Sequence, residues 1–196
     1  MYTGVQMNNL TSRLNEILPK LTSENLLSGR GLGNEIAFYI FDYPPEEEIE
    51  VRKHVQFLLK QIPKQRPGTK VSHVNLFDMV TGYLQDRKKL DKCFKMQLSK
   101  GDAALKDVLK APLQETKISK IFAEAAQPHE HDLVLVSGVG SVFPLLRSHT
   151  LLNNLHPVMG KTPLVMFFPG KYDGQTLKIF GKLSDNNYYR AFKLVP

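Results

Sequence analysis

A glycine-containing loop between two apolar segments is the part of the sequence best suited to bind an anion. The strand-like run 133–136 (LVLV) leads into SGVGS at 137–141, and VFPLLRSHTLLNNL follows. Glycines permit a tight turn, and backbone N–H groups at the start of the next helix would face a phosphate. An arginine one to two helical turns later could clamp that phosphate. The anion or nucleotide candidates are therefore Gly138, Gly140, Ser141 and Arg147.

The same loop lacks features of the known phosphate-binding motifs. It has no GKS or GKT ending, which would place a lysine on the terminal phosphates and a hydroxyl on magnesium. Phe143 occupies the position of the third glycine of the dinucleotide fingerprint. A tight strand-to-helix turn needs glycine for geometry alone, and Arg147 suits a structural salt bridge equally well. We expect no cofactor.

Two acidic or histidine-containing sites invite a metal or acid–base interpretation. Asp42 lies at the tip of the apolar run FYIFDY, and His129–Asp132 (HEHD) precedes the strand-like run 133–136. Aspartate is also common where a chain leaves a sheet, and no second carboxylate lies near Asp42 in the sequence. Adjacent ligands do not match the helical HExxH spacing, so a solvated loop is the favoured interpretation of HEHD. We expect neither a metal site nor a catalytic carboxylate.

Other reactive side chains have simpler structural explanations. His73 and Asp78 flank a strand-to-helix turn, where side-chain capping is more common than catalysis. Basic neighbours could lower the thiol pKa of Cys93, but a helical cysteine is usually a small packing residue. Six aromatic residues could form a partner-binding hot spot if exposed, although aromatics in strands are usually core. They are Tyr43, Phe167, Phe168, Tyr172, Tyr188 and Tyr189.

The charge distribution indicates an acidic partner. Lys and Arg number 26 against 19 Asp and Glu, which gives a net charge of +7 and a pI near 9.4. Between residues 86 and 120 there are ten basic residues and five acids. Such a stretch suits nucleic acid or an acidic protein surface, and it can also be a plain solvated helix face. The nucleic-acid candidates are Arg87, Lys88, Lys89 and Lys92.

Alternating strand-like and helix-like segments predict the fold that must position these residues. Buried strands are expected at 35–43, around 70–75, at 133–136 and at 162–170, with helices between them, including one at 142–155 that has Pro144 in its first turn. The stretches 175–181 and 187–195 read as an antiparallel hairpin. This pattern predicts an α/β fold: a mostly parallel, Rossmann-like or P-loop-like three-layer sheet with flanking helices and a C-terminal antiparallel hairpin.

Length and composition indicate one soluble domain. With 196 residues, we expect a single domain over 7–196, a possible extension at 1–6 because Met7 could be a start, and a helical insertion at 86–126. The single cysteine excludes an intramolecular disulfide and fits a cytoplasmic location. No apolar run approaches the roughly 20 residues of a membrane span, and the first ten residues show no secretory signal.

Several long blocks resemble a known family. FYIFDYPPEEE, VNLFDMVTGYL, DLVLVSGVGSVFPLLRSHTLLNNL and TPLVMFFPGKYDGQTLKIFG, ending in NYYRAF, look like the BrxB family, a core component of bacterial BREX phage-defence systems. The resemblance spans about residues 7–195. It implies a cytoplasmic bacterial protein that works with an adenine-specific DNA methyltransferase, a large ATPase and an alkaline-phosphatase-like protein of the PglZ family. It also implies a requirement for self-marking methylation and phage exclusion.

The resemblance carries over no catalytic residue. From it, and from the missing motifs, we expect a non-catalytic assembly or adaptor subunit that binds the alkaline-phosphatase-like protein first, and the methyltransferase and ATPase as further partners. The alternatives are a nucleotide-binding, degenerate NTPase-like protein and a DNA-binding accessory subunit that touches DNA directly or through its partners. No membrane partner is expected.

Overall fold

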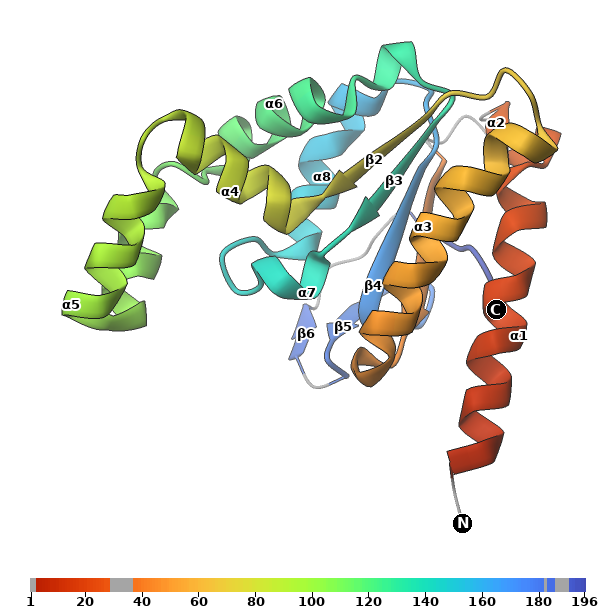
Figure 1. The fold of residues 1–196 in the computed structure, drawn as a ribbon, viewed down its shortest axis with the longest axis horizontal. Helices are drawn as coiled ribbons and strands as arrows, with labels where there is room; N and C mark the ends of the chain where they lie inside the picture. Colours follow the sequence, from red (N-terminus) through yellow and green to blue (C-terminus); the bar gives the residue numbers. More distant parts are fainter. Residues whose placement is uncertain (1–2, 29–36, 182, 186–190) are drawn as a thin grey trace.

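A central parallel sheet organises the molecule (Figure 1). The computed structural model describes residues 3–28, 37–181, 183–185 and 191–196. The parallel strands have the order β2-β3-β4-β1-β7, so the first strand of the chain lies between β4 and β7. Their bounds are β1 Phe38–Tyr43, β2 Val71–Asn75, β3 Leu133–Ser137, β4 Leu164–Tyr172 and β7 Phe192–Lys193. The expected mostly parallel α/β fold is confirmed, with an order unlike the two common doubly wound ones.

Helices cover both faces of the sheet and make three layers (Figure 1). One face packs against α1 and α3, and the other against α4, α6, α7 and α8, each face with its own buried apolar cluster. No described helix is long and apolar enough to cross a bilayer. The bounds are α1 Thr3–Leu21, α2 Glu24–Leu27, η1 Pro45–Glu47, α3 Glu48–Gln65, α4 Leu76–Asp86, α6 Glu115–Ala126, η2 Pro128–Glu130, α7 Val139–Val142 and α8 Ser148–Met159.

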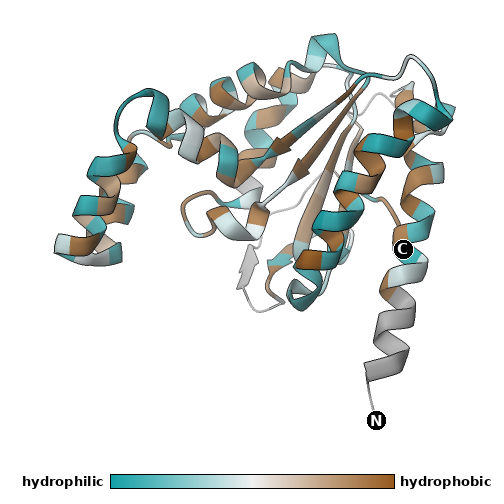
Figure 2. Cartoon of the chain, viewed as in Figure 1, coloured by the Kyte–Doolittle hydropathy of each residue, from teal (hydrophilic) through white to brown (hydrophobic). Residues whose placement is uncertain are grey.

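Burial follows the apolar pattern of each segment. All residues of β3 are buried, and Figure 2 colours this strand as mainly hydrophobic, as expected for an inner parallel strand. In α3 the buried positions Val51, Val55, Leu58 and Ile62 form one stripe at helical spacing. The Asn75 side chain caps α4 by accepting hydrogen bonds from the backbone N–H groups of Phe77 and Asp78.

The C-terminal pairing differs from the expected hairpin. Strand β5 (Leu177–Ile179) pairs antiparallel with the end of β4 and with β6 (Leu183–Asp185), which lies in the expected connector. The later stretch instead supplies β7, which runs parallel to β1, and residues 187–190 lie outside the described part. The reason is packing: Leu194 and Val195 are buried in the cluster beneath α1 and α3, which holds this segment against β1.

The expected helix at 142–155 is two helices. A non-helical connection separates α7 from α8, and Pro144 lies in that connection instead of in a first helical turn. The carbonyl of Val142 accepts hydrogen bonds from the backbone N–H groups of Leu145 and Leu146, which closes the end of α7. Because proline lacks an N–H group and restricts the residue before it, a continuous helix through this position is unfavourable.

Helix α5 (Leu90–Lys110) stands away from the sheet, at the far left of Figure 1. Gly101 has φ 79° and ψ 178°, which are not helical values, so α5 consists of two helical segments that meet at this residue. The buried residues of α5 are Cys93 and Leu109, whereas Leu98 is 89% exposed. Helix α6, the other helix of the expected insertion at 86–126, packs closely against α8. The domain boundaries themselves stay a prediction.

Candidate functional site

Asp42, near the carboxyl end of β1, has both side-chain oxygens occupied by protein groups. Arg13 Nη2 of α1 donates to its Oδ1 at 2.6 Å, and the backbone N–H of Tyr172 donates to its Oδ2 at 3.0 Å. Lys193 Nζ of β7 lies 3.8 Å from Oδ2, and the Asp42 side chain is 8% exposed. This carboxylate therefore joins α1, β1, β4 and β7, which explains it without a metal or a substrate.

Arg13 extends the same contact to the end of the chain. Its Nη1 donates to the Asp42 carbonyl at 2.8 Å, and its Nη2 also approaches the Val195 carbonyl at 3.3 Å. The guanidinium lies over the Phe41 ring, 4.8 Å from its centroid. Such stacking and multiple donation suit arginine better than lysine. The pair Arg13 and Asp42, 29 residues apart, is a structural clamp that sequence reasoning missed.

The glycine loop is filled by neighbouring side chains. Gly138 has φ +72°, and a Cβ there would lie 2.2 Å from Asn75 Oδ1. A Cβ on Gly140 would lie 3.0 Å from Pro169 Cγ and 3.1 Å from the Phe180 ring. Gly138 is thus required by its backbone conformation and close packing, whereas a side chain at Gly140 would make Pro169 and Phe180 shift slightly. Turn geometry and packing are the simpler of the two interpretations of this loop. The role of Gly138 and Gly140 in anion binding stays a prediction.

Ser141 takes part in a small polar network with α3. Its Oγ accepts a hydrogen bond from Arg52 Nη2 at 3.2 Å, and Arg52 Nε donates to Glu48 Oε1 at 2.7 Å. The Tyr43 hydroxyl donates to the other Glu48 oxygen. Burial, and then the adjacent Glu48 carboxylate, raise the pKa of Tyr43, so it stays a neutral donor. The β1-to-α3 connection is rich in acids, which is unfavourable for phosphate.

His73 and Ser137 form a contact that the sequence did not reveal. His73 Nε2 lies 2.8 Å from Ser137 Oγ, because β2 and β3 are neighbours with Asn75 opposite Ser137. Burial lowers the pKa of His73, and the nearby Asp78 charge opposes that shift. A neutral imidazole beside a hydroxyl can act as a base, but Ser137 is only 8% exposed. The residues are 64 positions apart, so only the strand order brings them together.

The remaining metal and thiol candidates serve local structure. The His131 ring nitrogen Nδ1 contacts the Gln127 carbonyl at 2.9 Å, and Asp132 accepts the backbone N–H of Lys70 at 2.8 Å. Within the described ranges, no group of three His, Cys, Asp or Glu side chains could hold a metal ion. Cys93 is free and buried, as a packing residue would be.

The aromatic hot-spot hypothesis is wrong for the residues that can be placed. Tyr43 is 2% exposed, and Phe167, Phe168 and Tyr172 are 0% exposed. Their rings belong to the buried clusters of the two sheet faces, since β1 and β4 are inner strands. Tyr188 and Tyr189 lie outside the described residues.

The nucleic-acid candidates gather at the turn between α4 and α5. All four are exposed, and the Arg87 guanidinium lies 4.6 Å from the centroid of the Tyr83 ring. The hollow of about 580 Å³ that Arg87 and Lys89 help to line is not uniformly positive, because Asp86 and Glu124 line it too. The structure therefore brings the cations of this turn together with acids. The four nucleic-acid candidates that lie at this turn are Arg87, Lys88, Lys89 and Lys92.

Arg147 belongs to a different surface from the glycine loop. It precedes α8, is exposed, and lines a groove of about 750 Å³ together with Lys106 and Lys110 of α5. Neither Gly138 nor Gly140 is among the described residues that line this groove. The four residues predicted as one anion site are thus divided between a packed loop and an open basic groove.

Comparison with known proteins assigns the family. The family model described as "BREX protein BrxB" matches residues 72–194. The chain belongs to the BrxB family. It is 40% identical over 193 residues to a BREX protein BrxB of Bacillus cereus (strain H3081.97), covering 96% of this chain and 99% of that protein. It is 37% identical over 187 residues to a BREX protein BrxB of Escherichia coli O9:H4 (strain HS), covering 95% and 92%. No solved structure matches.

Membership of the BrxB family confirms the resemblance of the sequence blocks and supports a role in BREX phage defence. In this BrxB-family chain the side chains suited to chemistry fall into two sets. Those at the carboxyl edge of the sheet, such as Asp42 and Ser137, are buried and paired. Those around α5, such as Lys106 and Arg147, are exposed. The i, i+4 spacing of Lys106 and Lys110 was the one available sequence signal for the second set.

Proposed function

We propose that the chain is a non-catalytic assembly or adaptor subunit of a BREX phage-defence complex. It binds the alkaline-phosphatase-like component of the PglZ family most directly, with the methyltransferase and the ATPase as further partners. Through these contacts it supports host DNA methylation and phage exclusion. Family membership supports the assignment to BREX, and the partner is the one that the family resemblance implies.

The observation that most supports a non-catalytic role is the filled carboxyl edge of the sheet. Parallel α/β proteins usually bind ligands beyond this edge, where polar groups are left free for substrate. Here Arg13 and the Tyr172 backbone occupy the Asp42 carboxylate, and Asn75 occupies the space beside Gly138. These groups are already paired with protein, so they are unavailable to a substrate.

The His73–Ser137 contact is the main argument for an enzyme, and two observations weigh against it. The first is the low exposure of Ser137, because a nucleophile must reach its substrate. The second is the relation to Asp78: in the described part of the chain this acid acts on His73 through its charge, with no hydrogen bond to orient the imidazole. We therefore assign the pair to sheet packing.

Co-purification tests the adaptor role. The tagged chain is co-expressed with the methyltransferase, the ATPase and the alkaline-phosphatase-like protein of the same system. We expect the alkaline-phosphatase-like protein to be recovered with the tagged chain after size-exclusion chromatography. A tagged chain that is folded, judged by circular dichroism, and recovers none of the three would contradict the proposal.

The Ser137→Ala variant tests the absence of catalysis. We expect it to keep complex formation, host methylation and phage exclusion, because it removes the hydroxyl and leaves the packing of β3 in place. His73→Gln is the companion variant, since its amide can still contact Ser137. Loss of phage exclusion in Ser137→Ala with an intact complex would show that the pair is catalytic.

A DNA-binding accessory role is the second candidate, favoured by the exposed cations of the α4–α5 turn. Phosphate contacts make affinity fall steeply with salt. The test is a gel shift with a duplex of about 20–30 bp, roughly two to three helical turns, at low salt. We expect the triple variant Lys88→Glu, Lys89→Glu, Lys92→Glu to weaken any binding. No shift of the unmodified chain at low salt would exclude this role.

A further inference from the structure

A groove opens where α5, α6 and the connection into α8 meet. The end of α5 forms one side, the start of α6 forms the base, and the segment that precedes and begins α8 forms the other side. Its volume is about 750 Å³, within the range of sites that hold a ligand or a peptide side-chain cluster.

The rim of the groove is positive. Lys106 and Lys110 lie one turn apart on α5, and Arg147 faces them from the start of α8. In the described part of the chain, Lys106 and Arg147 have no ion-pair partner, and Lys110 contacts Asp107 at 2.7 Å with both side chains 70% exposed. None of the described lining residues is an acid. Lys106 and Arg147 are therefore available to an acidic occupant, whereas Lys110 shares its charge with the exposed Asp107.

Two helix starts add to this positive field. Both α6 and α8 are 12 residues long, and both begin at the groove without a side-chain cap. Their first N–H groups carry the partial positive charge of the helix dipole. Together with the three cations, they make the groove attractive to carboxylates.

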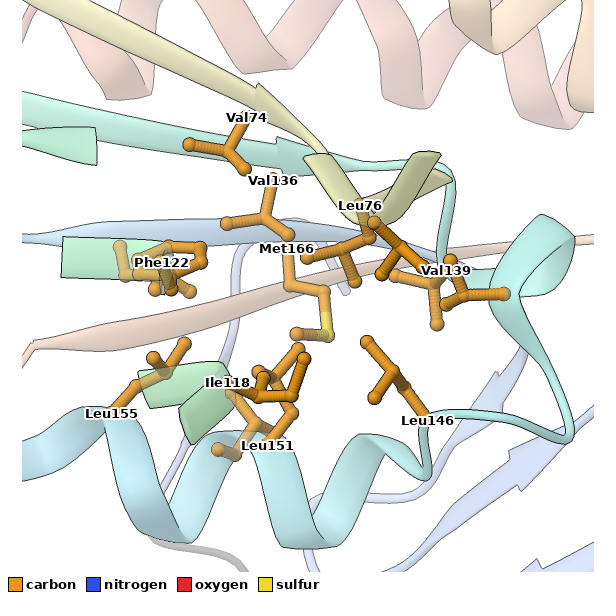
Figure 3. Packing of buried hydrophobic residues seen from close by; sticks show 14 of the residues in the cluster. Val74, Leu76, Ile118, Phe122, Val136, Val139, Leu146, Leu151, Leu155 and Met166 are labelled. Atoms are coloured by element: carbon orange, nitrogen blue, oxygen red, sulfur yellow. The ribbon is translucent and has the colours of Figure 1, made fainter. Parts of the chain in front are cut away.

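The floor of the groove is aliphatic. Leu109, Ile118, Leu146 and Leu151 are buried members of the core cluster beside the sheet, and Figure 3 shows the last three converging near Met166. No aromatic side chain is among the described lining residues, so a nucleic-acid base would have nothing to stack on. An aliphatic floor instead suits the apolar side chains of a polypeptide. This combination favours a protein segment over nucleic acid.

Helix α5, which carries Lys106 and Lys110, also has exposed apolar side chains. Phe94 is 53%, Leu98 89% and Val108 49% exposed on α5. Val108 directly precedes the groove residue Leu109. Large exposed apolar side chains next to a charged rim are typical of protein interfaces. Helix α5 can therefore extend the contact with the partner beyond the groove.

We propose that this groove is the docking site for an acidic segment of a partner protein. Aliphatic side chains of that segment enter the floor, and its carboxylates contact Lys106, Lys110 and Arg147. The inference rests on the proposed assembly role and goes beyond it, because it names the surface and the chemistry of the partner segment. The docking-site inference can be wrong while the assembly role is right.

Charge reversal in the groove tests the inference. The variant Lys106→Glu, Arg147→Glu is compared with Lys60→Glu, Lys64→Glu, which makes the same change of charge at exposed positions of α3 on the other face of the sheet. Binding to the co-expressed BREX components is measured at about 150 mM salt. We expect the groove variant to bind at least about tenfold more weakly and the control to stay within about twofold.

A neutral variant and a cross-link sharpen the test. Thr116→Trp fills the groove without changing its charge and should also weaken the complex. In the wild-type complex, a zero-length carbodiimide cross-linker should join Lys106 or Lys110 to Asp or Glu of the partner. Melting temperatures of all variants should match the wild type, since the substituted side chains are exposed.

Each contrary result has a distinct meaning. If the groove variant binds as well as the α3 control, the groove is not the docking site and the assembly role survives. If charge reversal weakens the complex but Thr116→Trp does not, the charges act at long range and the groove proposal is overturned. Loss of duplex DNA binding with the protein complex intact makes the groove a nucleic-acid surface, which also overturns it. If the wild type binds no BREX component, both proposals fail.

Discussion

The carboxyl edge of the sheet and the α5–α6–α8 groove use charged residues in opposite ways. At the edge, Asp42 is 8% exposed and is held by Arg13, Lys193 and a backbone N–H group. In the groove, Lys106 and Arg147 are exposed and have no ionic partner in the described part of the chain. Proteins of this fold usually bind ligands at the carboxyl edge of the sheet. In this chain, however, the cations without an ionic partner described above lie in the groove.

This difference separates stability from recognition. Buried charges that are paired and hydrogen-bonded hold elements together, and removing one partner leaves the other uncompensated. Exposed cations contribute little to folding, so their concentration in one groove is available for binding. The following variants break or sharpen that contrast.

The largest effect is expected for Asp42→Ala. Arg13 would lose its partner at a part-buried position, and the link between α1, β1 and β7 would be cut. We expect the free energy of unfolding to fall by about 3 kcal/mol, measured by urea denaturation. The control Arg52→Ala removes one partner of an exposed pair and should cost less than about 1 kcal/mol. Equal costs would remove the contrast between paired and exposed charges.

Gly138→Ala should have the second-largest effect. The new Cβ would meet Asn75 Oδ1 at 2.2 Å, at a backbone with φ +72°. Left-handed backbone strain of about 1–2 kcal/mol adds to a weakened cap on α4, so we expect a loss of about 2 kcal/mol or more. Gly68→Ala is the matched control, because Gly68 has φ +90° and open space around it. If both variants lose the same stability in urea, the close approach to Asn75 is unimportant.

A smaller effect concerns pH. Burial lowers the pKa values of His54 and His73 from 6.5, so on acidification the unfolded chain binds protons before the folded one. Stability should therefore decrease as pH falls from about 7.5 to 5.5. His73→Gln should make this decrease shallower, whereas the exposed His129→Gln should not. Urea midpoints across this range give the slopes, and identical slopes for His73→Gln and wild type would refute the assignment.

The smallest effect is expected in the groove. Lys106→Ala, Arg147→Ala should change the free energy of unfolding by no more than about 0.5 kcal/mol, because both side chains are exposed. The same variant should weaken the complex with the partner. A loss of stability comparable to that of Asp42→Ala would mean that the groove cations hold the fold together.

The sequence predicted the fold class because the inner strands are continuous apolar runs. Between amphipathic helices, the runs FYIFDY and LVLV are typical of strands that are buried on both faces of a parallel sheet. It did not predict the strand order, because β1 pairs with β4 across more than a hundred residues. The C-terminal pairing failed for the same reason: the position of β7 depends on the free edge of β1.

The candidate site was predictable only in part. Asp42 was expected at the tip of its strand, but its partners come from three distant elements that no spacing connects. Arg147 was singled out for its proximity in sequence to the glycines, whereas the connection through Pro144 directs it toward α5. Its neighbours Lys106 and Lys110 looked like ordinary residues of a solvated helix.

The placement of β1 between β4 and β7 has a consequence for biosynthesis. When FYIFDY leaves the ribosome, its neighbours on both sides have yet to be translated, since Phe38 aligns with Leu164 and Tyr39 with Phe192. Pairings of such sequence separation form slowly. A newly made chain must therefore keep an unpaired, apolar strand from associating with other polypeptides until its second half is complete, and chaperone demand should be highest in that interval.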